Sequence, residues 1–401
     1  MEFIPRTMGT RPRLACEVSA EGVVAARAED AFAVLSAVTR VLLADEVVVP
    51  RLTAIEADGT VDSSAANAVS SVVGGSAAGR AAVVAAVHKA LEAVALRSRE
   101  VTLVVPDTSV RVLLLEFDEL PAKPAEALPV VRFRLKKLLP FDADDAAVSY
   151  QVMSATKSLL RVLAVAMPRE LLADYESVVR EAGFEPGAIL PSTIAALAGL
   201  AETEAPQLIV NAGHEGVTTA IVKAGVLLLH RTVDLGADQR ADLKATQRAK
   251  AAATPLATSE IKLPLVDRER TAEEWARQEP LSLAEQNAVA VAVETERIEQ
   301  EVAAEIATEE RSESADEVAQ AISVAAAYFE DTLESSPSAI HAAGTLGAKA
   351  LTALLAEANV GPLVVREILS SDKLGPGAAT AGTPSGVPLG WLAGVRGALA
   401  N

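Results

Sequence analysis

Residues 101–197 constrain the fold more than any other part of the chain, because strand and helix patterns follow one another there in close order. The first pattern is a continuous apolar run, typical of a strand buried on both faces. Pro129 and Pro140 mark the start and the end of a helix, and Gly183 follows a second helix as its C-terminal cap. In order, the predicted elements are a strand at 101–105, a strand from 112, a helix at 130–139, strands at 148–152 and 161–166, and a helix at 168–182.

The same alternation of strands and helices continues on both sides of this region and predicts an α/β fold. Before it, residues 14–28 and 47–57 alternate apolar and polar side chains as strands do, whereas 30–43 and 77–96 have apolar residues at helical spacing. The sequence of residues 58–75 is compatible with either a helix or a loop. After it, a helix is predicted from its N-cap Ser192 to residue 200, followed by strands at 208–210, 217–222 and 226–233. A Ser314–Glu317 capping box then starts a predicted helix at 314–333. The last predicted elements are a short apolar run at 339–343, a helix at 348–359 and a strand at 363–368.

Length and charge limit the class of protein. A chain of 401 residues exceeds one ordinary core and predicts at least two lobes. The net charge of −18 gives a surface that repels nucleic acid and anionic lipid. Cys16 is the single cysteine, so we expect a reducing compartment and a small core residue rather than a disulfide. Because no stretch of 18 uninterrupted apolar residues is present, we expect a cytoplasmic protein.

Half of the net charge comes from residues 281–317, which contain eleven acidic residues and two arginines. Ile298, Val302 and Ile306 recur every four residues and predict a helix with one narrow apolar stripe. Such a helix buries little surface to offset its ordering entropy, so we expect the segment to be mobile or only locally helical up to about residue 313. Two interpretations stay open, a solvated acidic helix and a helix that faces a partner.

Five short motifs follow one another between residues 105 and 170: Val105-Pro106, Arg132-Phe133, Pro140-Phe141, Ser149-Tyr150-Gln151-Val152 and the run from Val162 to Glu170. In order and spacing they resemble the PilM family of actin-like cytoplasmic proteins of type IV pilus machines. The resemblance implies an actin-like two-lobed α/β fold of ribonuclease H-like repeats with a small inserted α+β domain. The implied domains are a first lobe at 1–111 and 168–203, the insertion at 112–167, a second lobe at 204–375 with a charged insertion at about 240–313, and a linker and C-terminal helix at 376–401 that pack back on the body.

The resemblance also implies a function. It predicts a non-catalytic cytoplasmic scaffold that binds the cytoplasmic tail of a single-span, PilN-like membrane protein in a groove between the first lobe and the insertion. The membrane would be reached only through this partner, and other pilus or secretion components would bind the same platform. The residues expected to bind the tail are Val105, Pro106, Arg132, Phe133, Lys136, Pro140 and Phe141.

Arg132 and Lys136 belong to the densest basic cluster of the chain, together with Arg134 and Lys137. On a helix, Arg132 and Lys136 share one face. The cluster either binds an acidic or peptide partner or is a solvated face. In the second interpretation it pairs within the chain with Asp142, Asp144 and Asp145.

Nucleotide chemistry in an actin-like fold needs small residues beside the phosphates, an acid for Mg²⁺ and a polar group that orients water. Ser19 stands where the family has glycine, and Asn211 stands where it has an acid. The residues of this degenerate site are Glu17, Ser19, Asn211, Gly213 and Gly344. We therefore expect no catalytic residue, no metal and no cofactor, with binding of ATP and Mg²⁺ as the alternative. His214 and Glu215 are expected to be an exposed loop pair, because no nucleophile accompanies them.

Two other functions stay open at this point. One is a working ATPase of the same fold. The other is a divergent cytoplasmic component of a type II secretion platform.

Overall fold

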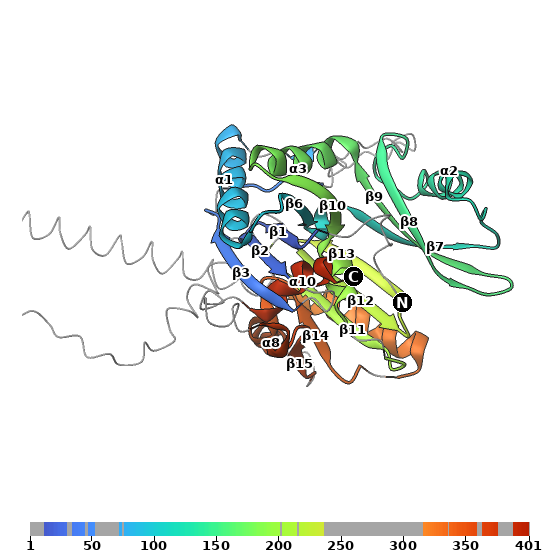
Figure 1. Cartoon of the computed structure of the whole chain (residues 1–401). Helices are drawn as coiled ribbons and strands as arrows, with labels where there is room; N and C mark the ends of the chain where they lie inside the picture. Colours follow the sequence, from blue (N-terminus) through green and yellow to red (C-terminus); the bar gives the residue numbers. More distant parts are fainter. Residues whose placement is uncertain are drawn as a thin grey trace, which may run out of the picture. The chain divides into compact units, whose positions relative to one another are not determined.

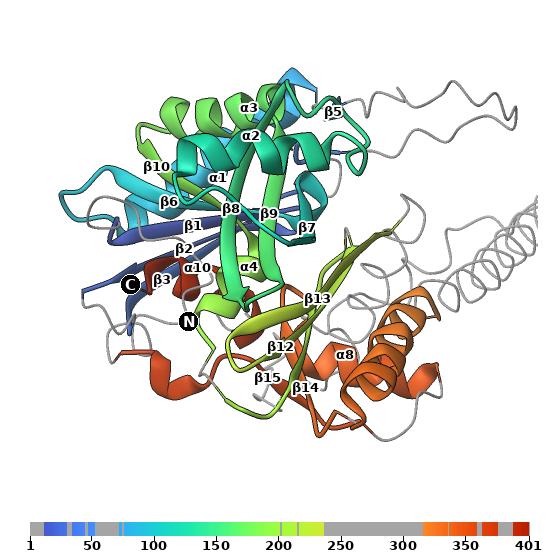
Figure 2. The same cartoon turned by 90° about the vertical axis from the view of Figure 1, so that its right-hand side faces the viewer.

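The computed structural model describes residues 12–29, 34–44, 47–52, 72–73, 76–200, 203–214, 216–235, 316–335, 337–358, 363–375 and 388–400. All of them belong to one compact unit made of residues 1–236 and 315–401. Figures 1 and 2 show two twisted sheets with helices packed around them, and a smaller sheet to one side. Within the described ranges, no helix is both long and apolar enough to cross a membrane.

The first lobe is built on a five-stranded sheet with the order β10-β6-β1-β2-β3. Its strands are β1 (Leu14–Ser19), β2 (Gly22–Ala28), β3 (Leu35–Leu42), β6 (Glu100–Val105) and β10 (Glu185–Pro191). β1, β2 and β3 pair antiparallel, whereas β6 runs parallel to both β1 and β10. Helices α1 (Ala77–Val94) and α3 (Arg169–Glu181) cover one face with apolar side chains. A short pair, β4 (Arg51–Leu52) and β5 (Val72–Val73), lies apart from this sheet.

The second lobe repeats this topology, in the order β13-β12-β11-β14-β15. Its strands are β11 (Gln207–Ala212), β12 (Gly216–Lys223), β13 (Val226–Asp234), β14 (Ile340–Ala343) and β15 (Val365–Glu367). The first three pair antiparallel and the last two run parallel to β11, as in the first lobe. The turn between β12 and β13 is made by Ala224 and Gly225, both with positive φ, as the sequence predicted. A helix over residues 316–333 and α8 (Gly347–Glu357) belong to this lobe.

The insertion lies between β6 and α3 in the chain. Its sheet has the order β7-β9-β8, with β7 (Arg111–Phe117), β8 (Ala146–Ala155) and β9 (Leu160–Pro168). Helix α2 (Pro124–Leu135) packs Val131 and Leu135 on the face of this sheet that points away from the lobes (Figures 1 and 2). The order of one strand, one helix and two strands is the one predicted from the sequence.

Two short helices lie between the five-stranded sheets and complete both cores. α4 (Ser192–Ala198) packs Ala195 toward the first sheet and Leu197 toward the second. α10 (Ala393–Leu399), preceded by the 3-10 turn η3 (Leu389–Leu392), packs against α4 and the first sheet. Gly394 and Gly397 permit this close approach, because a Cβ on Gly397 would clash with the Ala195 carbonyl, and one on Gly394 with the Glu17 carboxylate.

One predicted helix, over residues 30–43, is wrong. Residues 35–42 form β3, which completes an antiparallel hairpin with β2. The β-branched side chains of Val38, Thr39 and Val41 favour a strand, and the backbone pairing overrides the helical spacing of the apolar residues.

Two helix starts also differ from the prediction. α2 begins at Pro124 and not at 130, so Pro124 takes the first helical position and Pro129 lies inside the helix. Ser192 is the first residue of α4 and not its N-cap, which is Pro191. The Ser192 hydroxyl donates instead to Glu17, and this long-range hydrogen bond replaces the local cap.

Several predictions fall wholly or partly outside the described residues. Of the strand predicted at 47–57, only Arg51–Leu52 is a described strand, and residues 53–57 are not described. The acidic stretch from 281 to 315 and the Ser314 end of the capping box also lie outside the described ranges.

We expect Leu197→Ala to lower the free energy of unfolding by about 2–5 kcal/mol, because it would leave a cavity between α4 and the second sheet. Leu197 is fully buried, whereas Leu138 is 49% exposed and serves as the control for the same substitution. Leu138→Ala is expected to change stability by less than about 0.5 kcal/mol. Urea denaturation followed by circular dichroism measures both, and equal losses for the two variants would contradict this packing.

Candidate functional site

The residues of the predicted nucleotide site lie together in a cleft between the two lobes. Glu17 and Ser19 come from β1, Asn211 from β11, Gly213 from the loop after β11, and Gly344 follows β14. They meet because the carboxyl ends of the central strands of both sheets point to the same crevice. The Ser19 hydroxyl is turned back to its own hairpin and donates to the Gly22 carbonyl at 3.1 Å.

Asp107, in the 3-10 turn η1 (Asp107–Ser109) after β6, is the buried centre of this cleft. Its carboxylate accepts a hydrogen bond from the Thr193 backbone N–H at 3.1 Å and another from the Thr193 hydroxyl. The Asn211 amide nitrogen of the second lobe lies 3.2 Å from the same carboxylate. It also lies 3.0 Å from the Ser192 hydroxyl oxygen and 2.9 Å from that of Thr193. Asn211 therefore links the second lobe to the buried polar groups of the first.

Glu17 is 5% exposed and lies beside this network. Its Oε1 accepts a hydrogen bond from the Ser192 hydroxyl at 2.7 Å, while its Oε2 is buried against Gly394 of α10 with no hydrogen-bond donor among the described residues. Burial raises the pKa of Glu17 to about 8, although the Ser192 hydrogen bond opposes this shift. The carboxyl group is therefore mostly protonated at neutral pH.

Glu21 and His214 make a second contact between the lobes. Glu21, in the β1–β2 turn, accepts hydrogen bonds from the His214 backbone N–H at 2.8 Å and from His214 Nδ1. Burial alone would raise the pKa of Glu21, but the hydrogen bonds from His214 outweigh it and lower the pKa to about 2. The prediction of an exposed loop pair is wrong for His214, whose side chain is 5% exposed, because its loop folds against the first lobe. Glu215 lies outside the described residues.

The space left in the cleft is small. Its volume is about 60 Å³, whereas small-molecule sites are typically about 300–1,000 Å³. The ionised Glu21 borders it and would repel a phosphate group. Among the described residues, no group of three or more His, Cys, Asp and Glu side chains is placed to hold a metal ion. In this conformation the cleft can accept a few water molecules.

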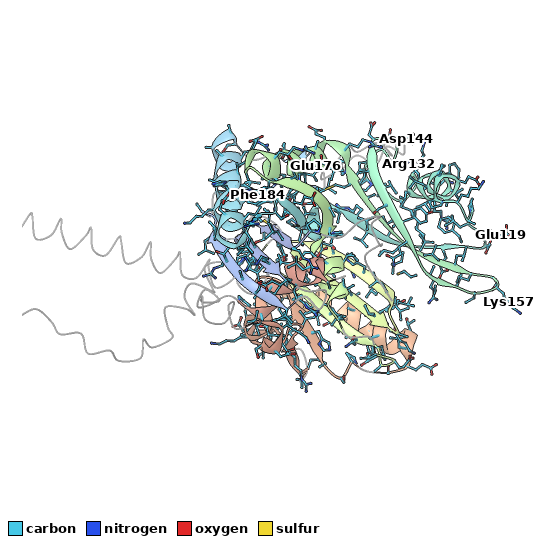
Figure 3. All side chains as sticks on the ribbon, in the orientation of Figure 1. Glu119, Arg132, Asp144, Lys157, Glu176 and Phe184 are labelled. Carbon is cyan, nitrogen blue, oxygen red and sulfur yellow. The ribbon has the colours of Figure 1, made fainter. Side chains whose placement is uncertain are left out.

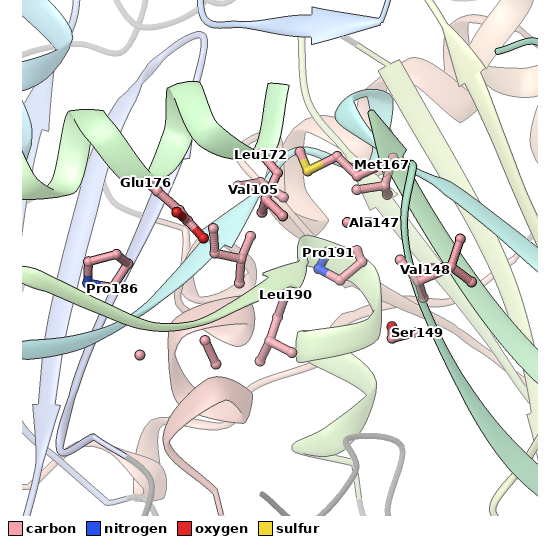
Figure 4. A pocket seen from close by; sticks show the side chains of 15 residues that line it. Val105, Ala147, Val148, Ser149, Met167, Leu172, Glu176, Pro186, Leu190 and Pro191 are labelled. Carbon is pink, nitrogen blue, oxygen red and sulfur yellow. The ribbon is translucent and has the colours of Figure 1, made fainter. Parts of the chain in front are cut away.

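A larger groove of about 300 Å³ lies where the first lobe meets the insertion (Figure 4). One wall is β10 at residues 186–191, and the opposite wall is β8 at residues 147–149. Leu172 and Glu176 of α3 close one side, and Val105 of β6 also lines it. β10 is the last strand of the first sheet and β8 the last strand of the insertion sheet. Within the described part of the chain, each therefore has one edge without a paired strand.

Most of the residues predicted to bind a partner do not line this groove. Val105 does, whereas Pro106 borders the cleft instead. Phe133 is 70% exposed on α2, Pro140 is exposed, and Phe141 is half-buried against the core. Of the seven residues, Val105 therefore lines the groove, and the five from Arg132 to Phe141 lie on α2 or shortly after it.

Two residues of the basic cluster, Arg132 and Lys136, make contacts within the chain. Arg132 donates to the carbonyl of Ala143 and, at 3.0 Å, to that of Ala146, and Lys136 forms an ion pair with Asp144 at 2.5 Å. Figure 3 shows Arg132 and Asp144 close together in the insertion. Lys136 therefore pairs with an aspartate as the second interpretation predicted, whereas Arg132 contacts backbone carbonyls and none of the three predicted aspartates. Arg134 is exposed on α2, and Lys137 is exposed in the turn that follows it.

Sequence reasoning missed Asp107, Glu21 and Thr193. A signal existed for Asp107, because it follows a buried strand at the end where ligands bind in parallel sheets. Glu21 and its partner His214 are 193 residues apart, and no local sequence pattern around either residue predicts their contact. The contact between them is set only by the packing of the two lobes.

We expect Glu17→Gln to stabilise the protein at high pH and to have little effect at low pH. The folded pKa of about 8 exceeds the ordinary value of 4.5, so the wild-type contribution to stability is full below about pH 4.5 and falls as the pH rises toward 8. Glutamine does not ionise and avoids this loss, which we expect to be at least about 1 kcal/mol at pH 8. Thermal unfolding of both proteins at pH 5 and pH 8 measures the difference. An equal effect at the two pH values would show that ionisation of Glu17 is not involved.

Comparison with known proteins establishes the fold. No protein-family model matches this sequence, and no curated protein matches it. A solved structure described as a PilM–PilN type IV pilus biogenesis complex matches with a TM-score of 0.59 and 15% identity, over 97% of this chain and 97% of that chain. The ethanolamine utilization protein EutJ from Carboxydothermus hydrogenoformans has a TM-score of 0.40 and 11% identity, over 97% of this chain and 89% of its own. The cytoplasmic domain of EpsL, from the type II secretion system of Vibrio cholerae, has a TM-score of 0.32 and 17% identity, over 58% and 74%.

The first of these matches confirms, at the level of fold, the resemblance seen in the sequence motifs. The duplicated sheet order and the insertion after β6 agree with it. The chain therefore has the two-lobed actin-like α/β fold, in a form similar to that of PilM over almost its whole length.

Proposed function

We propose that this chain is a non-catalytic scaffold of a type IV pilus inner-membrane platform. In this proposal it binds the cytoplasmic tail of a PilN-like single-span membrane protein in the groove between β8 and β10. The observation that carries the proposal is this groove of about 300 Å³, which is lined mainly by apolar side chains and lies between two strand edges that no strand of the described residues pairs with. An extended peptide adds to such an edge through main-chain hydrogen bonds, and its alternate side chains enter apolar pockets.

The choice of partner is supported by the fold. A structure similar to this chain along 97% of its length is described as a complex of PilM with PilN. The scaffold would be cytoplasmic and would reach the membrane through its partner, because a net charge of −18 disfavours direct contact with anionic lipid.

The absence of catalysis is supported by the contents of the cleft. The Asn211 amide donates a hydrogen bond to the Asp107 carboxylate, and the Glu17 carboxyl group is mostly protonated near neutral pH. Glu21 is ionised and bound to His214. A nucleotide and its Mg²⁺ would have to break both contacts between the lobes before phosphate and metal could approach.

A second candidate function keeps nucleotide binding. Asp107 lies at the carboxyl end of β6, where an acid can hold a metal ion or its waters. If the lobes separate, this carboxylate becomes available, and the chain would bind ATP with Mg²⁺.

Calorimetric titration with ATP and MgCl₂ distinguishes the two functions. We expect no dissociation constant tighter than about 1 mM, which corresponds to about 4 kcal/mol of binding free energy. Glu21→Ala is the informative comparison, because it removes both the inter-lobe contact and a negative charge beside the cleft. A micromolar dissociation constant with steady hydrolysis by the wild-type chain would favour the second candidate.

Binding of the tail is expected to depend on the groove. The probe is a fluorescent peptide with the sequence of the cytoplasmic tail of a PilN-like single-span protein. Ser149 is exposed and lines the groove, so Ser149→Arg would fill the space without disturbing a core. We expect it to weaken tail binding at least about tenfold, which is about 1.4 kcal/mol.

Phe133→Ala is the control, because Phe133 is 70% exposed and does not line the groove. We expect it to leave the affinity unchanged. If folded Ser149→Arg binds the tail normally while Phe133→Ala does not, the tail binds at α2 and the groove assignment is wrong.

A further inference from the structure

The side chains that line the groove between β8 and β10 are apolar with two exceptions. Of the fifteen described residues of this lining, Glu176 of α3 alone carries a charge, and Ser149 of β8 is the other residue with a polar side chain. Figure 4 shows the Glu176 carboxylate directed from α3 toward the space, with Pro186 on the same side and Ser149 on the opposite side. A segment bound in the groove therefore meets apolar side chains along most of its length and a single carboxylate.

The Glu176 carboxylate is only partly used within the chain. Its Oε2 accepts a hydrogen bond at 2.9 Å from Arg180, one turn further along α3, whereas no donor among the described residues is placed on Oε1. The two side chains are 33% and 51% exposed, and such partly exposed i,i+4 pairs are weak. Because a carboxylate accepts from several donors at once, a second cation can bind Oε1 while Arg180 keeps its contact.

The other acidic residues of α3 do not compete for this role. Asp174 and Glu181 form ion pairs with Arg80 of α1. Glu170 is exposed and does not line the groove. Glu176 is therefore the acid of this helix that a ligand in the groove would meet.

The spacing of Leu172 and Glu176 sets the spacing of side chains that a bound segment needs. Both line the groove from α3, and residues four apart on a helix have Cβ atoms about 5–6 Å apart. α3 packs against β10, and Figure 4 shows both running along the groove. In an extended segment beside β10, every second side chain faces α3, at intervals of about 6.6 Å. Two successive side chains on that face therefore reach Leu172 and Glu176.

We propose that Glu176 is a specificity-determining residue of the groove, which selects an extended segment with a lysine or arginine two positions from an apolar residue. The basic side chain binds Glu176 Oε1, and the apolar side chain packs on Leu172. An acidic residue at the same position is rejected, because two carboxylates would then face each other between apolar walls. This inference rests on the proposed function and adds to it the chemistry that the partner's tail must have.

The test measures, by fluorescence anisotropy, how tightly the full chain binds a fluorescent peptide with the sequence of the cytoplasmic tail of a PilN-like single-span protein. Glu176→Gln removes the charge at nearly constant size. We expect it to weaken binding about fivefold, the upper end for a partly exposed charge pair. Glu170→Gln is the matched control, because it removes the same charge from the same helix outside the groove. It should change the affinity by less than about twofold, since solvent and salt screen a distant exposed charge.

A double-mutant cycle then identifies the side chain that Glu176 selects. Each lysine or arginine of the peptide that lies two positions from an apolar residue is replaced by glutamine. We expect one replacement to weaken binding to the wild-type chain about fivefold and to have no effect on binding to Glu176→Gln. Exchanging that basic residue with its neighbour in the peptide keeps the composition but turns the side chain to the other face, so it should cause the same loss.

Equal affinities of Glu176→Gln and Glu170→Gln, or independent effects of the chain and peptide substitutions, would overturn the proposal. So would tight binding in the groove by a tail that has no basic residue at this spacing. In each of these outcomes the tail still binds and Ser149→Arg still weakens it, so the proposed function stands. A tail that binds no form of the chain would instead contradict the proposed function, and the role of Glu176 with it.

Discussion

The amide of Asn211 holds the second lobe to the first, and much of the architecture depends on that contact. One nitrogen lies within hydrogen-bond distance of the Asp107 carboxylate and of the Ser192 and Thr193 hydroxyls, all of them buried. Thr193 of the first lobe supplies the Asp107 carboxylate with two donors, and Asn211 adds one from the second lobe, so the second lobe completes a buried polar network that the first lobe begins. The network also fixes the N-terminal end of α4, the helix that both sheets share.

The two concave regions of the molecule differ in their lining and in the space they leave free. The cleft between the lobes is polar and nearly filled, with about 60 Å³ left. The groove beside the insertion is lined mainly by apolar side chains, with about 300 Å³ of space and the edges of β8 and β10 along it. In an actin-like fold the first region is where a nucleotide would lie and the second is peripheral. The proposed function rests on this difference in free space between the two regions.

Local patterns predicted local structure well, and failed where the determinant is distant in sequence. The β12–β13 hairpin and the insertion order followed from turn residues and alternation, whereas residues 35–42 became β3 because β2 pairs with them. The grouping of Glu17, Ser19, Asn211, Gly213 and Gly344 came from the family resemblance, and the structure places them in one cleft. Glu21 and His214 could not be paired from sequence, since only lobe packing brings them together. The acceptors of Arg132 could not be predicted from the sequence, because they are the backbone carbonyls of Ala143 and Ala146 and not acidic side chains.

The position of α10 has a consequence for how the chain is made. Its apolar residues complete the core of the first sheet, and Gly394 and Gly397 sit against Glu17 and Ala195, which are synthesised about two hundred residues or more earlier. During translation the first lobe emerges with this face uncovered, and it stays so while the long acidic stretch follows. A newly made chain therefore exposes an apolar sheet face until residues 389–399 leave the ribosome, and that interval is when chaperones or premature partners would find it.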